Sequence, residues 1–370
     1  MDEKPLYPGA GTTIELDIQP SYTVTDDRPY LFDLDRAKAD LLVAGPVGPS
    51  TVLRGSVGRF RFTDASTYIL TDTADGADFT LSTPLLRVRA AGAYTGLLLN
   101  PVSNYQMTRA DTIDSDDDDL FFGPRRLIAL TELTFPEVLL RQSVTASYIG
   151  QWDLRDADED AGEDTLSSHY AGLRLSGPIA SGLFHEIGFY LSPATRKASG
   201  DTESELGMLG SARLRYYRPD WSSSRFSVGG AVVSGMADTE DNFYTISSQD
   251  VGVVAEIPLK NIAYGEISYG LRPFSGSATR IFRDIQTSLT GRTMFRVSDT
   301  QPVDSFGATV SGDGKYVGTE AALKADWRIV SDRGVSVTWG AFYPGTGSSG
   351  AFTTERKPEY LLRVQVSASY

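Results

Sequence analysis

Arginines recur two residues apart along this chain, as in Arg59 and Arg61 and again in Arg87 and Arg89. Residues i and i+2 of a β-strand point to the same face, so each pair presents two guanidinium groups side by side. A guanidinium is always charged, and its planar fork pairs with carboxylates and phosphates. Such pairs would bind anionic solutes if they face water. Acids on neighbouring strands could instead neutralise them, and the sequence leaves both interpretations open.

Two acidic runs offer a different chemistry, the coordination of a divalent cation. The first run comprises Asp114, Asp116, Asp117, Asp118 and Asp119, and the second comprises Asp156, Asp158 and Asp160. Neither matches the calcium-binding loop of an EF-hand, since the first has Arg125 where that loop closes with a glutamate. A solvated, charged loop is the alternative interpretation, so a metal site stays open.

Catalytic chemistry has little support in the sequence. There is no cysteine, and the two histidines, His169 and His185, alternate in step with apolar residues rather than with candidate nucleophiles. No Gly-x-Ser-x-Gly elbow and no glycine-rich nucleotide fingerprint is present. We therefore expect no enzymatic activity and no cofactor.

The elements that carry the arginines are predicted to be β-strands. In the stretch 86–98, Leu86, Val88 and Leu98 fall on one parity, with Arg87 and Arg89 on the other. Similar rows occupy 140–152, 206–216, 263–271, 317–329 and 335–343. Helical periodicity is nearly absent, and the apolar runs are far shorter than the ~20 residues of a membrane-spanning helix. If the apolar faces meet lipid, the fold must be a closed barrel, which satisfies every backbone group.

The carboxyl-terminal segment has the same alternation and ends on an aromatic residue. Its apolar face comprises Tyr360, Leu362, Val364, Val366, Ala368 and Tyr370. This segment resembles the last strand of Gram-negative outer-membrane β-barrel proteins, which end in Phe and sometimes Tyr. The resemblance implies the outer membrane of a diderm bacterium. It also implies that this strand is the signal for the barrel-insertion machinery, and that it pairs with the first strand, 12–24, to close the barrel.

The connections between strands fall into two classes that alternate along the chain. Short ones include 45–49, 260–261 and 331–334, and longer ones lie near 99–123, 155–166, 194–204, 237–246, 275–311 and 344–354. We predict one all-β domain over 1–370, a transmembrane antiparallel barrel of about 16 strands with 14 as the alternative. Short periplasmic turns and long extracellular loops are typical of such barrels.

With the apolar rows against lipid, the opposite face is predicted to line an aqueous lumen rich in cations. These lumen cations are Arg59, Arg61, Arg87, Arg89, Arg141, Arg174, Arg213, Arg215, Arg225, Arg272, Lys324, Arg328 and Arg363. Arg54 is an exception whose register points it outward. The loop 99–123 occupies the position of the inward-folded loop of the general porins that this architecture resembles, and 275–311 is an alternative plug. The arginines also resemble, more loosely, those of alginate-exporting barrels.

These features predict a channel for passive or substrate-selective diffusion of small hydrophilic, anionic solutes. The net charge of −14 argues against nucleic acid as a partner. Expected partners are outer-membrane lipids and lipopolysaccharide, the insertion machinery and the solutes, with monomer or homotrimer left open. The alternatives are a non-conducting structural or surface-display barrel and, third, a barrel enzyme.

Overall fold

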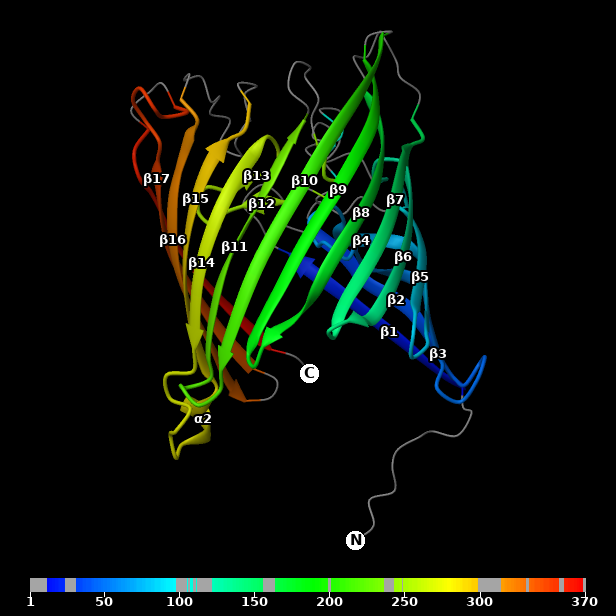
Figure 1. Ribbon diagram of the computed structural model, residues 1–370, viewed down its shortest axis with the longest axis horizontal. Coiled ribbons are helices and arrows are strands. Elements are labelled where there is room, and N and C mark those ends of the chain that lie inside the picture. The colour runs from blue at the N-terminus through cyan, green and yellow to red at the C-terminus, as the bar shows by residue number, and fades with distance from the viewer. Residues whose placement is uncertain are drawn as a thin grey trace. The chain divides into compact units, whose positions relative to one another are not determined.

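Strands make up nearly all of the regular structure in the computed structural model of the chain (Figure 1). It describes residues 12–23, 31–97, 105, 107, 108, 111, 122–155, 164–198, 201–235, 243–247, 249–298, 314–330, 333–352 and 356–368. Within this part of the chain, helix α2 (Arg280–Arg283) is a single turn. None of its helices has the length and apolar character needed to span a membrane.

Sixteen of the strands form one antiparallel sheet. In chain order they are β1 (Thr12–Thr23), β2 (Leu31–Ala44), β3 (Val52–Thr63), β4 (Thr71–Ser82), β5 (Arg87–Tyr94), β6 (Arg126–Leu139), β7 (Gln142–Asp153), β8 (Thr165–Ala180), β9 (Leu183–Ala198), β10 (Asp201–Arg218), β11 (Ser224–Gly235), β14 (Ile262–Leu271), β15 (Ile285–Arg296), β16 (Tyr316–Val330), β17 (Arg333–Pro344) and β18 (Glu359–Ala368). Each pairs with its neighbour in this order, so the predicted count of 16 strands is confirmed.

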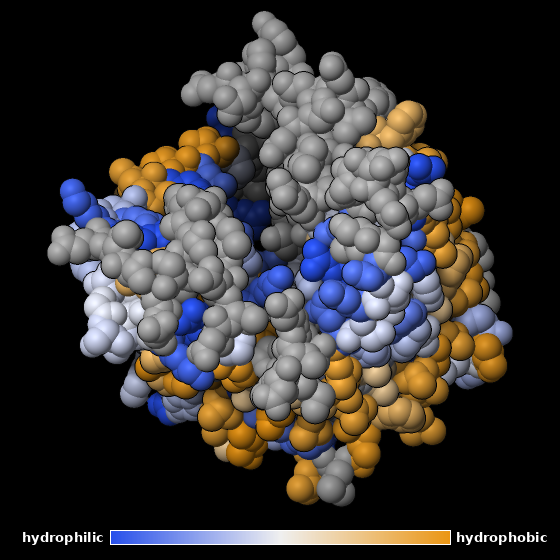
Figure 2. Space-filling model, turned by 90° about the horizontal axis from the view of Figure 1, so that it is seen from above, coloured by the Kyte–Doolittle hydropathy of each residue, from blue (hydrophilic) through white to orange (hydrophobic). Residues whose placement is uncertain are grey.

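Alternation of apolar and polar residues gives the sheet two different faces. On β18, Tyr360, Leu362, Val364 and Val366 are all exposed on one face, and Arg363 and Gln365 lie on the other. On β1, Ile14 is likewise exposed, with Glu15 beside it on the opposite face. Figure 2 shows hydrophobic residues gathered in orange patches on the surface. Because exposed apolar area costs about 25 cal/mol per Å² in water, these rows suit a lipid surface. We call the opposite face the polar face.

The chain divides into two compact units. Unit 1 comprises Met1–Arg174, Tyr190–Glu205 and Tyr244–Ser248, and unit 2 comprises Leu175–Phe189, Leu206–Phe243 and Gln249–Tyr370. Unit 1 therefore contains β1 to β7 and unit 2 contains β11 to β18, while β8, β9 and β10 contribute residues to both.

Three predicted connections are wrong. Most of the long connection expected near 194–204 belongs to two strands, because β9 extends to Ala198 and β10 begins at Asp201. The stretch 275–311 is not one loop, because it contains β15. The row of β15 expected to be apolar includes Thr287, Gly291 and Thr293, so the sequence of this strand shows no clear alternation of apolar and polar residues. The turn predicted at 260–261 lies instead inside a long connection, 236–261, that carries the separate pair β12 (Asp250–Val251) and β13 (Ile257–Pro258). The connection from β14 to β15 contains α2, at the lower end of unit 2 in Figure 1.

The sequence of the segment 249–259 has the pattern expected of a strand, with an apolar residue at every second position. These residues are Val251, Val253, Ala255, Ile257 and Leu259. Its backbone is not extended throughout, since Gly252 has a φ of 111°, and a proline at position 258 lacks the amide hydrogen of a central strand. Burial rather than lipid contact explains these apolar residues, most of which are inaccessible to solvent.

The sheet ends at β1 on one side and at β18 on the other. Hydrogen bonding between these two strands, which closure of the barrel requires, is absent among the residues that the structure describes. The closing pair inferred from the sequence therefore stays a prediction.

Candidate functional site

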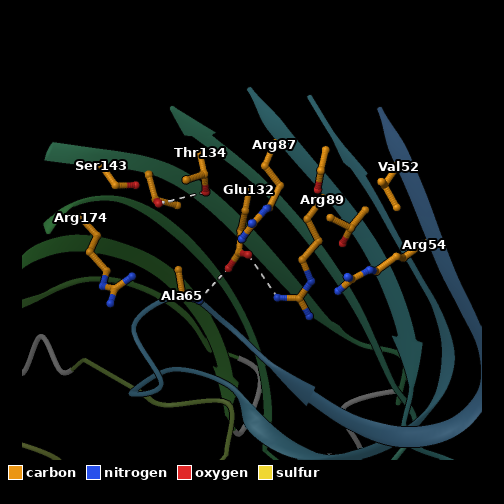
Figure 3. A pocket seen from close by; sticks show the side chains of 12 residues that line it. Val52, Arg54, Ala65, Arg87, Arg89, Glu132, Thr134, Ser143 and Arg174 are labelled. Carbon is orange, nitrogen blue, oxygen red and sulfur yellow. Dashed lines mark hydrogen bonds and ion pairs between the residues drawn. The ribbon is translucent and has the colours of Figure 1, made fainter. Parts of the chain in front are cut away.

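A cavity of about 600 Å³ on the polar face of unit 1 brings four of its arginines together, Arg54, Arg87, Arg89 and Arg174 (Figure 3). Strand register explains the grouping, since Arg54 lies opposite Thr80, Thr80 opposite Arg89, and Arg89 opposite Glu132. Serine and threonine hydroxyls complete the lining, at Thr80, Ser82, Thr134, Ser143 and Thr145. A cavity of this size with convergent polar groups can hold a small solute.

Arg89 is neutralised within this site. Its guanidinium lies 2.6 Å from Asp78 and 3.1 Å from Glu132, and it also donates to the carbonyl oxygen of Thr63. With three acceptors around it, Arg89 is fixed in place and contributes little free positive charge.

Arg54 and Arg87 differ from Arg89, because neither forms an ion pair within the described part of the chain. Both side chains are exposed to the cavity. Their charge is therefore available to an anion, and Arg54 and Arg87 are the groups most suited to attract one.

The position of Arg54 corrects the outward orientation inferred from the sequence. Arg59 and Arg61, predicted to share the polar face with Arg87, are not among the residues lining this cavity. Arg59 is buried, with its guanidinium 2.7 Å from Asp75 and its Nε donating to the carbonyl oxygen of Leu34. Gly58 lies between Arg54 and Arg59 and has a φ of 125°. Alternation of side chains between the two faces therefore cannot be extended across Gly58 to assign a face to Arg54.

Glu132 also holds a connection against the polar face of unit 1. The backbone N–H of Ala65 donates to Glu132 at 2.6 Å. The Asp64 carboxylate stabilises the same connection, because it accepts hydrogen bonds from the backbone N–H groups of Ser66, Ile69 and Leu70. Burial raises the pKa of the Asp64 carboxyl above its ordinary value, although these hydrogen bonds oppose the shift. The connection from β3 to β4 is thus folded inward.

A buried charge cluster anchors the connection from β5 to β6. Asp111 lies 2.6 Å from Arg126 and 2.9 Å from Arg155, and Asp153 lies 3.1 Å and 2.8 Å from the same two arginines. Arg126, Asp111 and Asp153 are fully buried. We call these four residues the Asp111 cluster. Asp114, Asp116, Asp117, Asp118 and Asp119, predicted to form a constriction or to bind a cation, lie outside the described residues.

On the polar face of unit 2, an arginine also lies between acidic residues of the neighbouring strands, as Arg89 does in unit 1. Register aligns Glu266 with Arg292 and Arg292 with Glu320 across β14, β15 and β16. The Arg292 Nε donates to Glu266 at 3.0 Å, and its Nη1 lies 3.3 Å from Glu320. Arg213 approaches Glu266 only to 3.8 Å, and Arg215 lies 3.3 Å from Glu186. The arginines of β10 are therefore held more loosely than Arg292.

Glu320 holds a second connection, as Glu132 does in unit 1. Its carboxylate accepts from the backbone N–H groups of Val253, Val254 and Ala255 at 2.9–3.3 Å. The glycine at position 252 permits this approach, because a Cβ there would lie 2.7 Å from a Glu320 oxygen. In each unit a glutamate paired with an arginine thus fixes an inward-folded connection, a role that sequence parity could not reveal.

Solved structures of outer-membrane proteins are similar to this chain over almost its whole length. The outer membrane protein OprD from Pseudomonas aeruginosa is 13% identical, with a TM-score of 0.52 over 96% of this chain and 83% of its own. Pseudomonas aeruginosa OccK1 (OpdK) is 10% identical, with a TM-score of 0.56 over 98% and 88%. Pseudomonas aeruginosa OccK11 (OpdR) is 12% identical, with a TM-score of 0.54 over 96% and 85%.

The fold is that of an outer-membrane porin barrel. The predicted fold class is therefore confirmed, and the predicted outer-membrane location agrees with these structures. No protein-family model and no curated protein matches the sequence.

The remaining predicted barrel residues have diverse positions. Arg174 lines the unit 1 cavity, and Arg328 lies on β16. Arg272 follows the end of β14 and lines a cavity in unit 2. Arg141 does not lie within a strand, since it forms the two-residue turn between β6 and β7 with a φ of 64°. Tyr370, Asp156, Asp158 and Asp160 lie outside the described residues.

The described part of the barrel contains no cluster of His, Asp and Glu suited to hold a metal ion. His169 accepts or donates one hydrogen bond at Nδ1, 2.9 Å from the Tyr148 hydroxyl, and its ring contacts Trp152. Tyr148 belongs to the exposed apolar row of β7. This environment suits an aromatic residue at a membrane interface better than a catalytic base.

Truncating Glu320 provides a test of the inward-folded connection. In Glu320→Ala we expect faster amide hydrogen exchange at Val253, Val254 and Ala255, because three backbone donors lose their acceptor. Glu320→Gln retains an acceptor oxygen and should show a smaller increase. Unchanged exchange in Glu320→Ala, measured by mass spectrometry on the folded barrel, would mean that other contacts hold this segment.

Proposed function

We propose that this chain is an outer-membrane channel through which small hydrophilic, anionic solutes diffuse, with residues 1–370 forming a single barrel domain. The observation that carries the proposal is the pair Arg54 and Arg87, whose guanidinium groups face one cavity without an ion-pair partner in the described residues. Uncompensated charge on the wall of a pore raises the local concentration of ions of opposite sign.

The partners follow from this role. The exposed apolar rows would contact outer-membrane lipids and lipopolysaccharide, and β18 would be recognised by the insertion machinery. The barrel could act as a monomer or a homotrimer. We assign it no catalytic activity and no cofactor. The acidic runs at 114–119 and 156–160 are proposed as loop segments that could bind divalent cations.

Ion selectivity tests the proposal. In a planar bilayer with a salt gradient, the reversal potential of the wild-type protein should show preference for chloride over potassium. The double variant Arg54→Gln/Arg87→Gln should lose most of that preference, because it removes both unpaired charges and leaves the Arg89 ion pairs intact. Arg333→Gln is the control, since Arg333 is exposed at the start of β17, does not line the cavity and is not one of the predicted lumen cations. A cation preference in the wild type would contradict the proposal.

A non-conducting structural barrel is the second candidate. The inward-folded connections held by Glu132 and Glu320 favour it, because folded loops can fill a lumen. The same bilayer recording separates the candidates, since a filled lumen would give no steady open-channel current.

A further inference from the structure

The connection from β14 to β15, residues 272–284, lies at the lower end of unit 2 (Figure 1) and carries an aromatic cluster. Phe274 and Phe282 have ring centroids 6.5 Å apart, and Phe282 stacks on Trp327 of β16 at 6.3 Å. The Trp327 Nε1 donates to the carbonyl oxygen of Ile281 at 2.9 Å, so the indole holds α2 against the sheet. We call Phe274, Ile281, Phe282 and Trp327 the α2 cluster.

The α2 cluster lies on the lipid side of β16 rather than on its polar face. Trp327 has the same parity as Leu323, an exposed residue of the apolar row, whereas Glu320 has the opposite parity. The other three members of the cluster are 43–51% exposed. Because aromatic side chains favour the interface between membrane and water, the cluster extends the lipid-facing surface beyond the end of the strand.

The edge of the sheet at which α2 lies is the edge with the short turns. In unit 2 the connections 219–223 and 331–332 leave the sheet at the same edge as 272–284. Short turns of outer-membrane barrels lie on the periplasmic side. The α2 cluster is therefore at the level of the periplasmic leaflet, which consists of phospholipid rather than lipopolysaccharide.

The connection that carries the cluster is basic, although the chain as a whole has a net charge of −14. Residues 272–284 include three arginines and a single acid, Asp284. Arg283 is exposed and has no ion-pair partner within the described residues. Its Nε and Nη2 donate to the carbonyl oxygen of Ser277 at 3.1 and 2.9 Å, which orients the guanidinium beside the cluster. Such a group is suited to a phosphate.

From this arrangement we infer that the α2 cluster and Arg283 form a binding site for an anionic phospholipid of the periplasmic leaflet. The rings of Phe274 and Phe282 contact the apolar part of the lipid, and Arg283 pairs with its phosphate. Apolar rings beside cations are typical of segments that lie in a membrane interface and recognise anionic headgroups. The site is separate from the polar face, so lipid binding does not depend on conduction through the barrel.

Native mass spectrometry of the full chain in detergent tests the inference with phosphatidylglycerol and phosphatidylcholine of identical acyl chains. Phosphatidylglycerol should bind more tightly, because the basic connection repels the choline ammonium group. Arg283→Gln should lower the phosphatidylglycerol affinity about fivefold, the typical contribution of one cation beside an anionic headgroup, and leave the phosphatidylcholine affinity nearly unchanged. Phe274→Ser/Phe282→Ser should weaken both lipids. Arg333→Gln is the matched control, since Arg333 is exposed at the same edge but outside the α2 connection.

Equal affinities of the wild-type protein for the two lipids would overturn the inference. An equal loss of phosphatidylglycerol affinity in Arg333→Gln and Arg283→Gln would also overturn it, because binding would then follow the total charge of this edge. A dimer in the same spectra that Phe274→Ser/Phe282→Ser dissociates would assign the cluster to contact between two copies and overturn the lipid site. Heat-modifiable mobility of each variant measures whether the barrel is folded, so a loss of affinity is scored only in folded protein.

Discussion

Arg126→Ala is expected to lower the free energy of unfolding of the barrel by about 3–5 kcal/mol, the typical effect of removing one partner from a buried ion cluster. Arg126 is fully buried between Asp111 and Asp153 and also donates to the carbonyl oxygen of Leu166. Its removal leaves two buried carboxylates with Arg155 as their remaining cation in the Asp111 cluster. The uncompensated charge, rather than the lost contact area, causes most of the effect.

Urea unfolding of protein refolded into lipid vesicles, followed by tryptophan fluorescence, measures this change. Arg126→Lys keeps the positive charge but lacks the planar guanidinium group, so we expect a smaller decrease in the free energy of unfolding than for Arg126→Ala. Arg61→Ala is the control, because Arg61 is exposed and should change the unfolding free energy by less than about 0.5 kcal/mol. Equal unfolding midpoints for Arg126→Ala and Arg61→Ala would show that the cluster contributes nothing to stability.

The Asp111 cluster also shows why the site was harder to predict than the fold. Alternation of single residues along Tyr360–Val366 is enough to identify a lipid-facing strand, because every second side chain meets the same medium. The partner of a charged residue depends on register and on how connections fold. Asp111 reaches Arg126 through a connection that sequence periodicity does not describe.

Two local departures from regular strand geometry explain the main errors. Gly58 has a positive φ, and extending parity across it gave Arg54 an outward orientation, whereas Arg54 lines the unit 1 cavity. The segment 249–259 has strand-like alternation, but most of its apolar residues are buried in a connection whose backbone donates hydrogen bonds to Glu320. In the second case the alternation is present in the sequence, but its physical cause is burial rather than a lipid-facing strand.

The total of 16 strands was nevertheless predicted, because two errors compensated. One expected strand, within 249–259, belongs to a connection, and one expected loop contains β15. The arginine pair Arg87 and Arg89 was correctly placed on one face of β5, since that strand is regular and pairs without a bulge. What parity could not predict is that Arg89 is neutralised by Asp78 and Glu132 whereas Arg87 stays unpaired in the described chain.

The carboxyl-terminal strand gives the prediction with the largest expected effect on assembly. Deleting residues 366–370 should abolish insertion into the outer membrane. This deletion removes the end of β18, an edge of the sheet, together with the aromatic residue that the resemblance identifies as part of the insertion signal. An unpaired strand edge in lipid also costs several kcal/mol for each unsatisfied backbone group, so a shortened strand could not close the barrel.

Surface labelling of intact cells and heat-modifiable mobility of the extracted protein measure insertion and folding separately. Tyr370→Ala should lower the inserted fraction, because it removes the terminal aromatic residue of the lipid-facing row. Ser369→Ala is the matched change on the opposite parity and should have nearly wild-type insertion. Normal surface levels of the five-residue deletion would show that the carboxyl-terminal strand neither directs insertion nor closes the barrel, and β1 would then need another partner.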